Sequence, residues 1–180
     1  MKRVIVITGT PATGKTSVAE KLAKALDCSE LIKANDIVKK KKLFTSKAAD
    51  GAMVARMDKL GKEINSAVKK SKADFVIVEG HLLCDMRVEG AVAVVMREHL
   101  KTLLKRLKER RYSRQKIEDN IVSEGIDYCG VNALKNYKEV YEIENGPGAM
   151  EKIIEIANGK RIRTEEIEML GELNALLSKL

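Results

Sequence analysis

The 180-residue chain predicts an α/β fold, in which a five-stranded parallel sheet is flanked by helices on both faces. Short runs rich in Val and Ile alternate with amphipathic helical stretches, the order that parallel strand connections require. The first of these runs is followed at once by a glycine-bounded loop ending in Gly-Lys-Thr. The length is that of one domain with a short appendage.

The five predicted strands are mostly continuous apolar runs, which are typical of strands buried on both faces of a sheet. They cover residues 3–8, 31–34, 75–78, 91–96 and 139–143. Apolar residues that recur every three to four positions predict helices between the strands. These helices cover residues 15–26, 53–68, 100–107, 116–134 and 149–157, the last after a Gly-Pro-Gly turn.

The end of the chain predicts a linker over residues 159–163 and then a terminal helix. Its apolar stripe consists of Ile167, Leu170, Leu173, Leu177 and Leu180. The Thr164 hydroxyl suits the N-cap of that helix. The stripe either packs on the chain's own core or contacts a second copy or a partner, so the chain is expected to be a monomer or a weak dimer.

The chain is basic, with 34 Lys and Arg against 26 Asp and Glu, a net charge of +8. A positive field attracts polyanions without distinguishing nucleotides, RNA and acidic protein surfaces. One cluster consists of Lys33, Lys39, Lys40, Lys41, Lys42 and Lys47, and a second runs from Lys101 to Lys116. Each cluster can equally be a solvated face.

Several classes of protein are excluded by composition. Two Pro, no Trp and 33% charged residues do not fit collagen, low-complexity disorder or an aromatic nucleic-acid platform. The longest uncharged apolar run, residues 90–96, is too short to cross a bilayer, and the N-terminus does not resemble a signal peptide. Cys28, Cys84 and Cys129 lack metal-site spacing and are odd in number, which favours a reducing, cytoplasmic setting.

The strongest motif is Gly9-Thr-Pro-Ala-Thr-Gly-Lys-Thr16, which matches the P-loop pattern G-x-x-x-x-G-K-[ST] at every fixed position. Its glycines let backbone amides converge on a phosphate, and the N-terminus of the following helix adds its positive end. Lys15 supplies a charge to the β- and γ-phosphates of a nucleotide, and Thr16 is a ligand for Mg²⁺.

A second Mg²⁺ partner is expected at the end of a neighbouring strand. Glu79 follows the apolar run 75–78, and Gly80 permits a close turn after it. We therefore predict a Mg²⁺ site formed by Thr16 and Glu79. His81 either orients a water or phosphate near this site or is an ordinary loop histidine.

Two arginines follow at helical spacing. Arg106 and Arg110 are four residues apart and so project from one helix face. Planar guanidinium groups suit phosphate oxygens and aromatic faces, so the pair could clamp a transferred phosphoryl group. The alternative is a pair of ordinary surface arginines.

Taken in order, these motifs resemble the adenylate kinase isoenzyme 6 type family, which is nuclear in eukaryotes, also present in archaea and linked to small-ribosomal-subunit maturation. The resemblance is carried by residues 9–16, 34–39 (Ala-Asn-Asp-Ile-Val-Lys), 78–81 (Val-Glu-Gly-His) and 106–113, then by Lys116, Asn120 and Glu124. It covers residues 1–158, and the chain looks most like an archaeal member.

The resemblance implies a nucleoside monophosphate kinase domain over residues 1–159, with a helical tail over 160–180. The monophosphate-binding segment would fall at 34–56 and the lid at 109–119. By matching motifs, Ala12, Gly14, Lys15, Thr16 and Ser17 would hold the phosphates of ATP. Arg110 would reach them from the lid, and Gly146 would lie in the loop that contacts adenine.

Two positions depart from the family pattern. Ala12 stands where many members have Gly, a mild change because Ala tolerates ordinary helical or extended backbone conformations, though not a left-handed one. Lys39 stands where many members have Arg, which removes a bidentate phosphate contact. The second departure bears on the identity of the acceptor and on turnover.

Three functional hypotheses follow. The first is an adenylate kinase that transfers phosphoryl from MgATP to AMP, with some ATPase activity. The second is an ATP-switched assembly factor that engages a platform protein of the small ribosomal subunit or rRNA; the chain lacks an RNA-recognition motif, so such contact would be electrostatic or protein-mediated. The third, a small-metabolite kinase of the shikimate kinase type, shares the fold but fits the lid sequence poorly.

Overall fold

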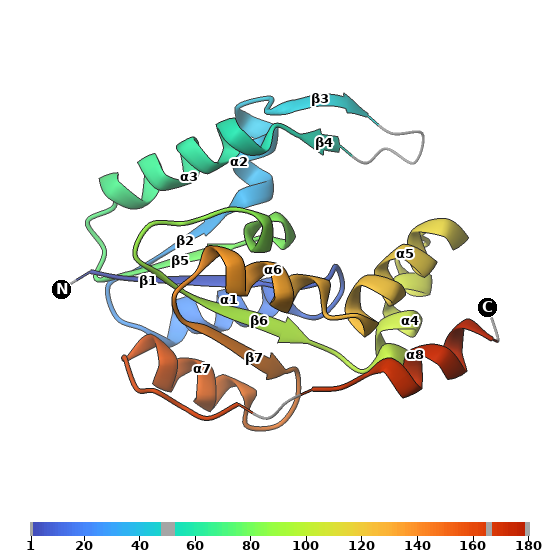
Figure 1. Ribbon diagram of the computed structural model, residues 1–180. Helices are drawn as coiled ribbons and strands as arrows, with labels where there is room; N and C mark the ends of the chain where they lie inside the picture. Colours follow the sequence, from blue (N-terminus) through green and yellow to red (C-terminus); the bar gives the residue numbers. More distant parts are fainter. Residues whose placement is uncertain (1, 48–52, 165–166, 179–180) are drawn as a thin grey trace.

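A computed structural model describes residues 2–47, 53–164 and 167–178. Its main sheet is parallel, in the order β2-β5-β1-β6-β7. The strands are β1 (Arg3–Thr8), β2 (Ser29–Lys33), β5 (Phe75–Glu79), β6 (Ala91–Arg97) and β7 (Val140–Glu144). The five predicted strands are thus confirmed with small shifts at their ends, and helices cover both faces of the sheet (Figure 1).

Most of the helices lie where the apolar stripes predict them. They are α1 (Lys15–Ala25), α2 (Ala34–Lys40), α3 (Met57–Lys70), η1 (His81–Asp85, a 3₁₀ helix), α4 (Leu100–Glu109), α5 (Arg114–Gly125), α6 (Tyr128–Asn136), α7 (Ala149–Ala157) and α8 (Leu170–Leu177). Of these, α2 and η1 were not predicted. One core contains residues of α2, α3, η1 and α6, and the core on the opposite face contains residues of α1 and α7. A third core joins α4, α5 and α8.

The strand order determines where a ligand can bind. β1 is the central strand, paired with β5 on one side and β6 on the other. Parallel sheets bind ligands at their carboxyl edge, where connections leave in opposite directions from adjacent strands. The loops that follow β1, β5 and β6 therefore meet at one edge.

Two predicted helices differ from the structure. Residues 53–55 form β4 (Met53–Ala55), which pairs antiparallel with β3 (Phe44–Lys47), so that α3 begins only at Met57. The predicted helix over 116–134 breaks at Asp127, which has a left-handed φ of 53° and caps α6 by accepting from the Gly130 N–H. The apolar periodicity continues through residues 53–55 and through Asp127. It therefore reveals neither the pairing of β4 with β3 nor the left-handed residue that separates α5 from α6.

The tail helix begins later than predicted, at Leu170 rather than near Thr164. It packs on α4 and α5, where Leu173 is buried against Gly125. The Glu172 carboxylate accepts from the backbone N–H groups of Leu100 and Lys101 and so caps α4. Leu170 and Leu177 are exposed, and Leu180 lies outside the described residues. Part of the predicted stripe therefore packs on the chain's own core.

In the described part of the chain, no helix combines the length and the apolar character needed to span a membrane.

Candidate active site

A cleft of about 630 Å³ lies at the carboxyl edge of the sheet, where the loops after β1 and β5 meet α2 and the turn after α4. Its lining includes predicted site residues from three places in the sequence: Ala12, Gly14, Lys15, Thr16, Ser17, Glu79, His81 and Arg110. The other lining residues are Pro11, Asn35, Val38, Lys39, Ala55, Leu82, Tyr112 and Lys116. Gly9, Arg106 and Gly146 lie outside this lining.

The P-loop runs from β1 into α1, as its motif predicts. Gly9 has a φ of 132°, and a Cβ there would collide with the carbonyl oxygen of Met96. Gly14 has a φ of 95°, and a Cβ there would lie 2.8 Å from the amide nitrogen of Asn145. Both glycines are therefore required by backbone conformation and by close packing.

Ala12 has a left-handed backbone, with a φ of 74°. The expectation that Ala is a mild change from Gly at this position is therefore wrong. A left-handed conformation costs a residue with a Cβ about 1–2 kcal/mol. The Ala12 side chain is buried in the core that joins α4, α5 and α8, which holds the strained residue in place.

The Lys15 side chain lies along the loop, and its Nζ donates to the Thr10 carbonyl oxygen at 2.9 Å. Burial lowers the pKa of the Lys15 ammonium, and the negative charge of Glu79 opposes that shift. The charge of Lys15 is thus held at the phosphate loop with a carboxylate nearby.

Glu79 ends β5 directly beside the P-loop strand, since it pairs with Ile7 of β1. Its carboxylate is buried and faces the same cleft as the Thr16 hydroxyl. A hydroxyl and a carboxylate are the oxygen donors that Mg²⁺ prefers, so these residues fit the predicted ion.

His81 also lines this cleft, at the start of η1. Burial, together with the positive charges of Lys15 and Lys116, lowers the pKa of its imidazole to about 4. His81 is therefore neutral at pH 7, able to donate from one ring nitrogen and accept at the other.

The two predicted arginines have different surroundings. Arg110 caps the C-terminus of α4 and lines the cleft. Arg106 donates from Nη1 to the Glu98 carboxylate at 2.6 Å and to the Ala12 carbonyl oxygen at 3.2 Å. Only Arg110 thus faces the cleft, and a direct role for Arg106 in catalysis stays a prediction.

Two residues that the sequence analysis missed lie behind the P-loop. Glu98, 4% exposed, accepts from Arg106 and from the side-chain amide of Asn145, at 3.0 Å. Asn145 in turn lies against Gly14. Glu98 comes directly after β6, and Glu79 is the last residue of β5. The rule that selected Glu79, a carboxylate after the apolar run of a central strand, could therefore have found Glu98.

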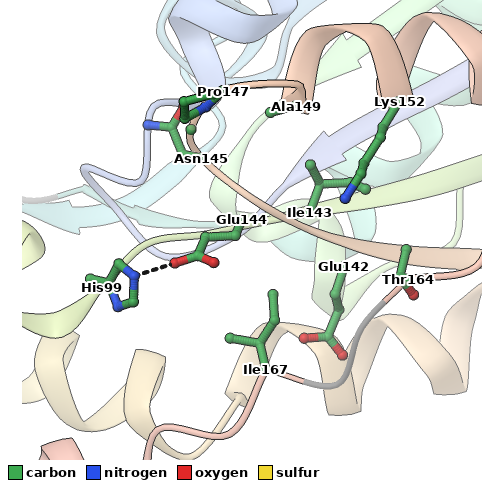
Figure 2. Close-up of a pocket in the computed structure, with 11 residues that line it drawn as sticks. His99, Glu142, Ile143, Glu144, Asn145, Pro147, Ala149, Lys152, Thr164 and Ile167 are labelled. Atoms are coloured by element: carbon green, nitrogen blue, oxygen red, sulfur yellow. Dashed lines mark ion pairs between the residues drawn. The ribbon is translucent and has the colours of Figure 1, made fainter.

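Gly146 lines a second cavity, of about 340 Å³, beside the edge strand β7 (Figure 2). His99 points toward Glu144 and pairs with it at 2.6 Å, and Thr164 and Ile167 contribute from the tail. Asn145 borders this cavity and also contacts Gly14, so the two cavities adjoin through one side chain. A contact between Gly146 and adenine stays a prediction.

Residues 5–127 match the AAA domain family. The chain is 34% identical to the "Putative adenylate kinase" of Pyrococcus furiosus over 156 residues, 86% of this chain and 82% of that protein. It is 33% identical to the protein of the same name from Archaeoglobus fulgidus, over 94% of this chain and 93% of that one. In structure it is similar to shikimate kinase from Acinetobacter baumannii, with a TM-score of 0.60, 16% identity and coverage of 91% and 97%.

The fold and the phosphate loop define a P-loop protein of the kinase-like class. Within that class, the chain belongs to the family of archaeal proteins named putative adenylate kinase. The predicted family and fold class are both confirmed. The similarity to shikimate kinase, at 16% identity, shows the shared fold alone.

Proposed function

We propose that the chain is an adenylate kinase, which transfers the γ-phosphoryl group of MgATP to AMP. The observation that carries the proposal is the two-sided lining of the cleft. The P-loop forms one side, and residues of α2 and β4 form the other. Two nucleotides entering from opposite sides would meet with their phosphates between Lys15 and Arg110.

On the donor side, the P-loop amides and Lys15 would bind the β- and γ-phosphates, and Arg110 would approach from the turn after α4. Thr16 and Glu79 would hold Mg²⁺, which would offset the negative charge of the phosphates. A phosphate oxygen of the acceptor would form a bond to the γ-phosphorus while the bond from that phosphorus to the bridging oxygen breaks, which leaves two ADP molecules. Catalysis in this scheme is positioning and charge stabilisation.

On the acceptor side, Asn35, Val38, Lys39 and Ala55 line the cleft. Lys39 supplies a point charge for a monophosphate rather than a bidentate contact. The segment 34–56 is therefore the proposed monophosphate-binding part, and the turn around Arg110, within 109–119, the proposed lid. The neutral His81 would donate to a phosphate oxygen or orient a water.

The test is ADP production from MgATP with AMP, CMP, UMP, GMP or no acceptor, with shikimate as a further acceptor. The proposal expects turnover that depends on AMP. Turnover that is independent of any acceptor would contradict it and would support an ATPase instead. Turnover with shikimate alone would support the small-metabolite kinase.

An ATP-switched ribosome-assembly factor is a second candidate, and the lysines beyond Lys39 favour it. Lys40, Lys41 and Lys42 are exposed, and none of them lines the cleft. That charge exceeds what one monophosphate requires and suits an anionic surface such as rRNA. Recovery of small-subunit protein or rRNA from extract at low salt, dependent on MgATP, would support this role. Recovery that ignores nucleotide would count against it.

A further inference from the structure

A buried carboxylate, Glu98, joins three segments around the P-loop. One of its oxygens, Oε2, accepts from Arg106 of α4 at 2.6 Å and from the amide of Asn145, after β7, at 3.0 Å. Arg106 continues to the Ala12 carbonyl oxygen, and Asn145 lies against Gly14. Both partners of Glu98 thus touch the phosphate loop.

The backbone of Glu98 is fixed as well. Its N–H donates to the Glu124 carboxylate at 3.0 Å, and Glu124 forms an ion pair with Arg97, also at 3.0 Å. The side chains of Arg97 and Glu124 are each 1% exposed. Glu98 therefore has little freedom to move, and a group that it holds is held in a defined place.

The P-loop, which these contacts stabilise, contains a strained backbone conformation at Ala12. Ala12 is left-handed although it carries a Cβ, and such a conformation persists only where the surroundings fix it. The Arg106 contact to its carbonyl oxygen and the burial of its side chain supply that constraint. We propose that Glu98 is a positioning residue for ATP, holding Arg106 and Asn145 against the P-loop and so fixing its phosphate-binding conformation.

This inference rests on the proposed function and assigns Arg106 a supporting part. The Arg106 guanidinium donates to Glu98 and to the Ala12 carbonyl oxygen, so it stabilises the loop. Arg110 lines the cleft, where it would contact the phosphates. Loss of Glu98 should therefore weaken the binding of ATP and leave the chemical step and the acceptor largely unaffected.

The test is Glu98→Gln, which keeps the shape and removes the charge. The control is Glu155→Gln, whose carboxylate pairs with Lys160 on the surface. Calorimetry measures the Kd for MgATP, and initial rates give KM for ATP, KM for AMP and kcat. Because hydrogen bonds to charged groups are stronger than those between neutral groups, we expect Kd and KM for ATP to rise about tenfold or more in Glu98→Gln. The kcat, KM for AMP and the control should change by less than about threefold on the same reasoning.

An unchanged Kd for ATP in folded Glu98→Gln would overturn the inference, and so would a fall in kcat with KM for ATP unchanged. If this variant does not fold, Asn145→Ala and Arg106→Ala remove its contacts singly, and normal ATP affinity in both would overturn it. Adding Glu98→Gln to Arg106→Ala should give less than the sum of the two effects, because both act through one network. The Kd for MgATP can be measured without turnover. A wild-type chain without kinase activity would therefore contradict the proposed function, whereas the Kd of the variants would still test the role of Glu98.

Discussion

The two sides of the cleft are built in different ways. On the proposed donor side, the P-loop is supported by side chains from the end of β6, from α4 and from the loop after β7, with the buried Glu98 at their centre. On the proposed acceptor side, α2 and the turn after it present exposed lysines, and among the described residues Lys41 pairs with the surface residue Glu63 in a 3.0 Å contact. Surface ion pairs contribute little to stability. The donor side is therefore preorganised, whereas the acceptor side relies on solvated point charges.

This difference predicts that changes on the donor side act on the reaction itself, and that changes on the acceptor side act on the choice and affinity of the second substrate. The variants below separate the two sides, each with a matched control.

The largest effect is expected for Lys15→Ala. It removes the charge that is proposed to stabilise the β- and γ-phosphates, and the loss of such a stabilising group costs on the order of 10²–10³ in turnover. Initial rates with MgATP and AMP measure it, with Lys21→Ala on the exposed face of α1 as the control. Near-normal turnover in a folded Lys15→Ala protein would contradict a role for the P-loop in the reaction.

Arg110→Ala should lower the rate of transfer to AMP by about 10- to 100-fold, the range for losing a hydrogen bond to a charged group. It should also raise the fraction of ATP that is hydrolysed, because a lid that closes over the phosphates excludes water. The ratio of ADP formed by transfer to free phosphate is the measurement. The control is Lys108→Ala, exposed on α4, which should leave that ratio unchanged. An unchanged ratio in Arg110→Ala would show that Arg110 has no part in excluding water from the transfer.

The acceptor side is tested by Lys39→Ala. Since Lys39 is exposed, loss of its charge should raise KM for AMP only by about twofold to fivefold, with KM for ATP unaffected. Lys40→Ala, the neighbouring lysine outside the cleft, is the control. An equal rise in KM for ATP would show that the two sides are not separate in the way proposed.

The smallest effect is expected for Ala12→Gly. Removing the Cβ relieves the left-handed strain, while the freer unfolded chain and the lost packing offset part of the gain, so that unfolding becomes harder by up to ~1 kcal/mol. Urea unfolding measures it. Ala25→Gly, in the last turn of α1, should instead lower stability by about 0.5–1 kcal/mol. A loss of stability in Ala12→Gly would mean that packing of the Cβ outweighs the strain.

The two sides also differ in what could be predicted from the sequence. Lys15, Thr16 and Glu79 were predictable because a short motif and a strand end fix their places. The support behind them was predictable only in part. The place of Glu98 after a central strand could have been recognised, but its role depends on Arg106 and Asn145, which lie 8 and 47 residues away along the chain.

Backbone reversals were equally hidden. Asp127 interrupts an apolar periodicity that continues on either side of it. At Ala12 the strain arises from a left-handed φ, which the residue pattern does not reveal. The β4 strand was missed because Met53 and Met57 have helical spacing, whereas its structure depends on pairing with β3. Local sequence thus predicts the elements and the motif better than it predicts long-range contacts.

The central claim is that the cleft transfers phosphoryl between two nucleotides, and the destination of a labelled γ-phosphate tests it most directly. The wild-type chain is incubated with Mg²⁺, γ-labelled ATP and AMP, and the labelled products are separated. The account predicts label in ADP, formed only when AMP is present. Label recovered solely as inorganic phosphate, at a rate that does not depend on AMP, would contradict it.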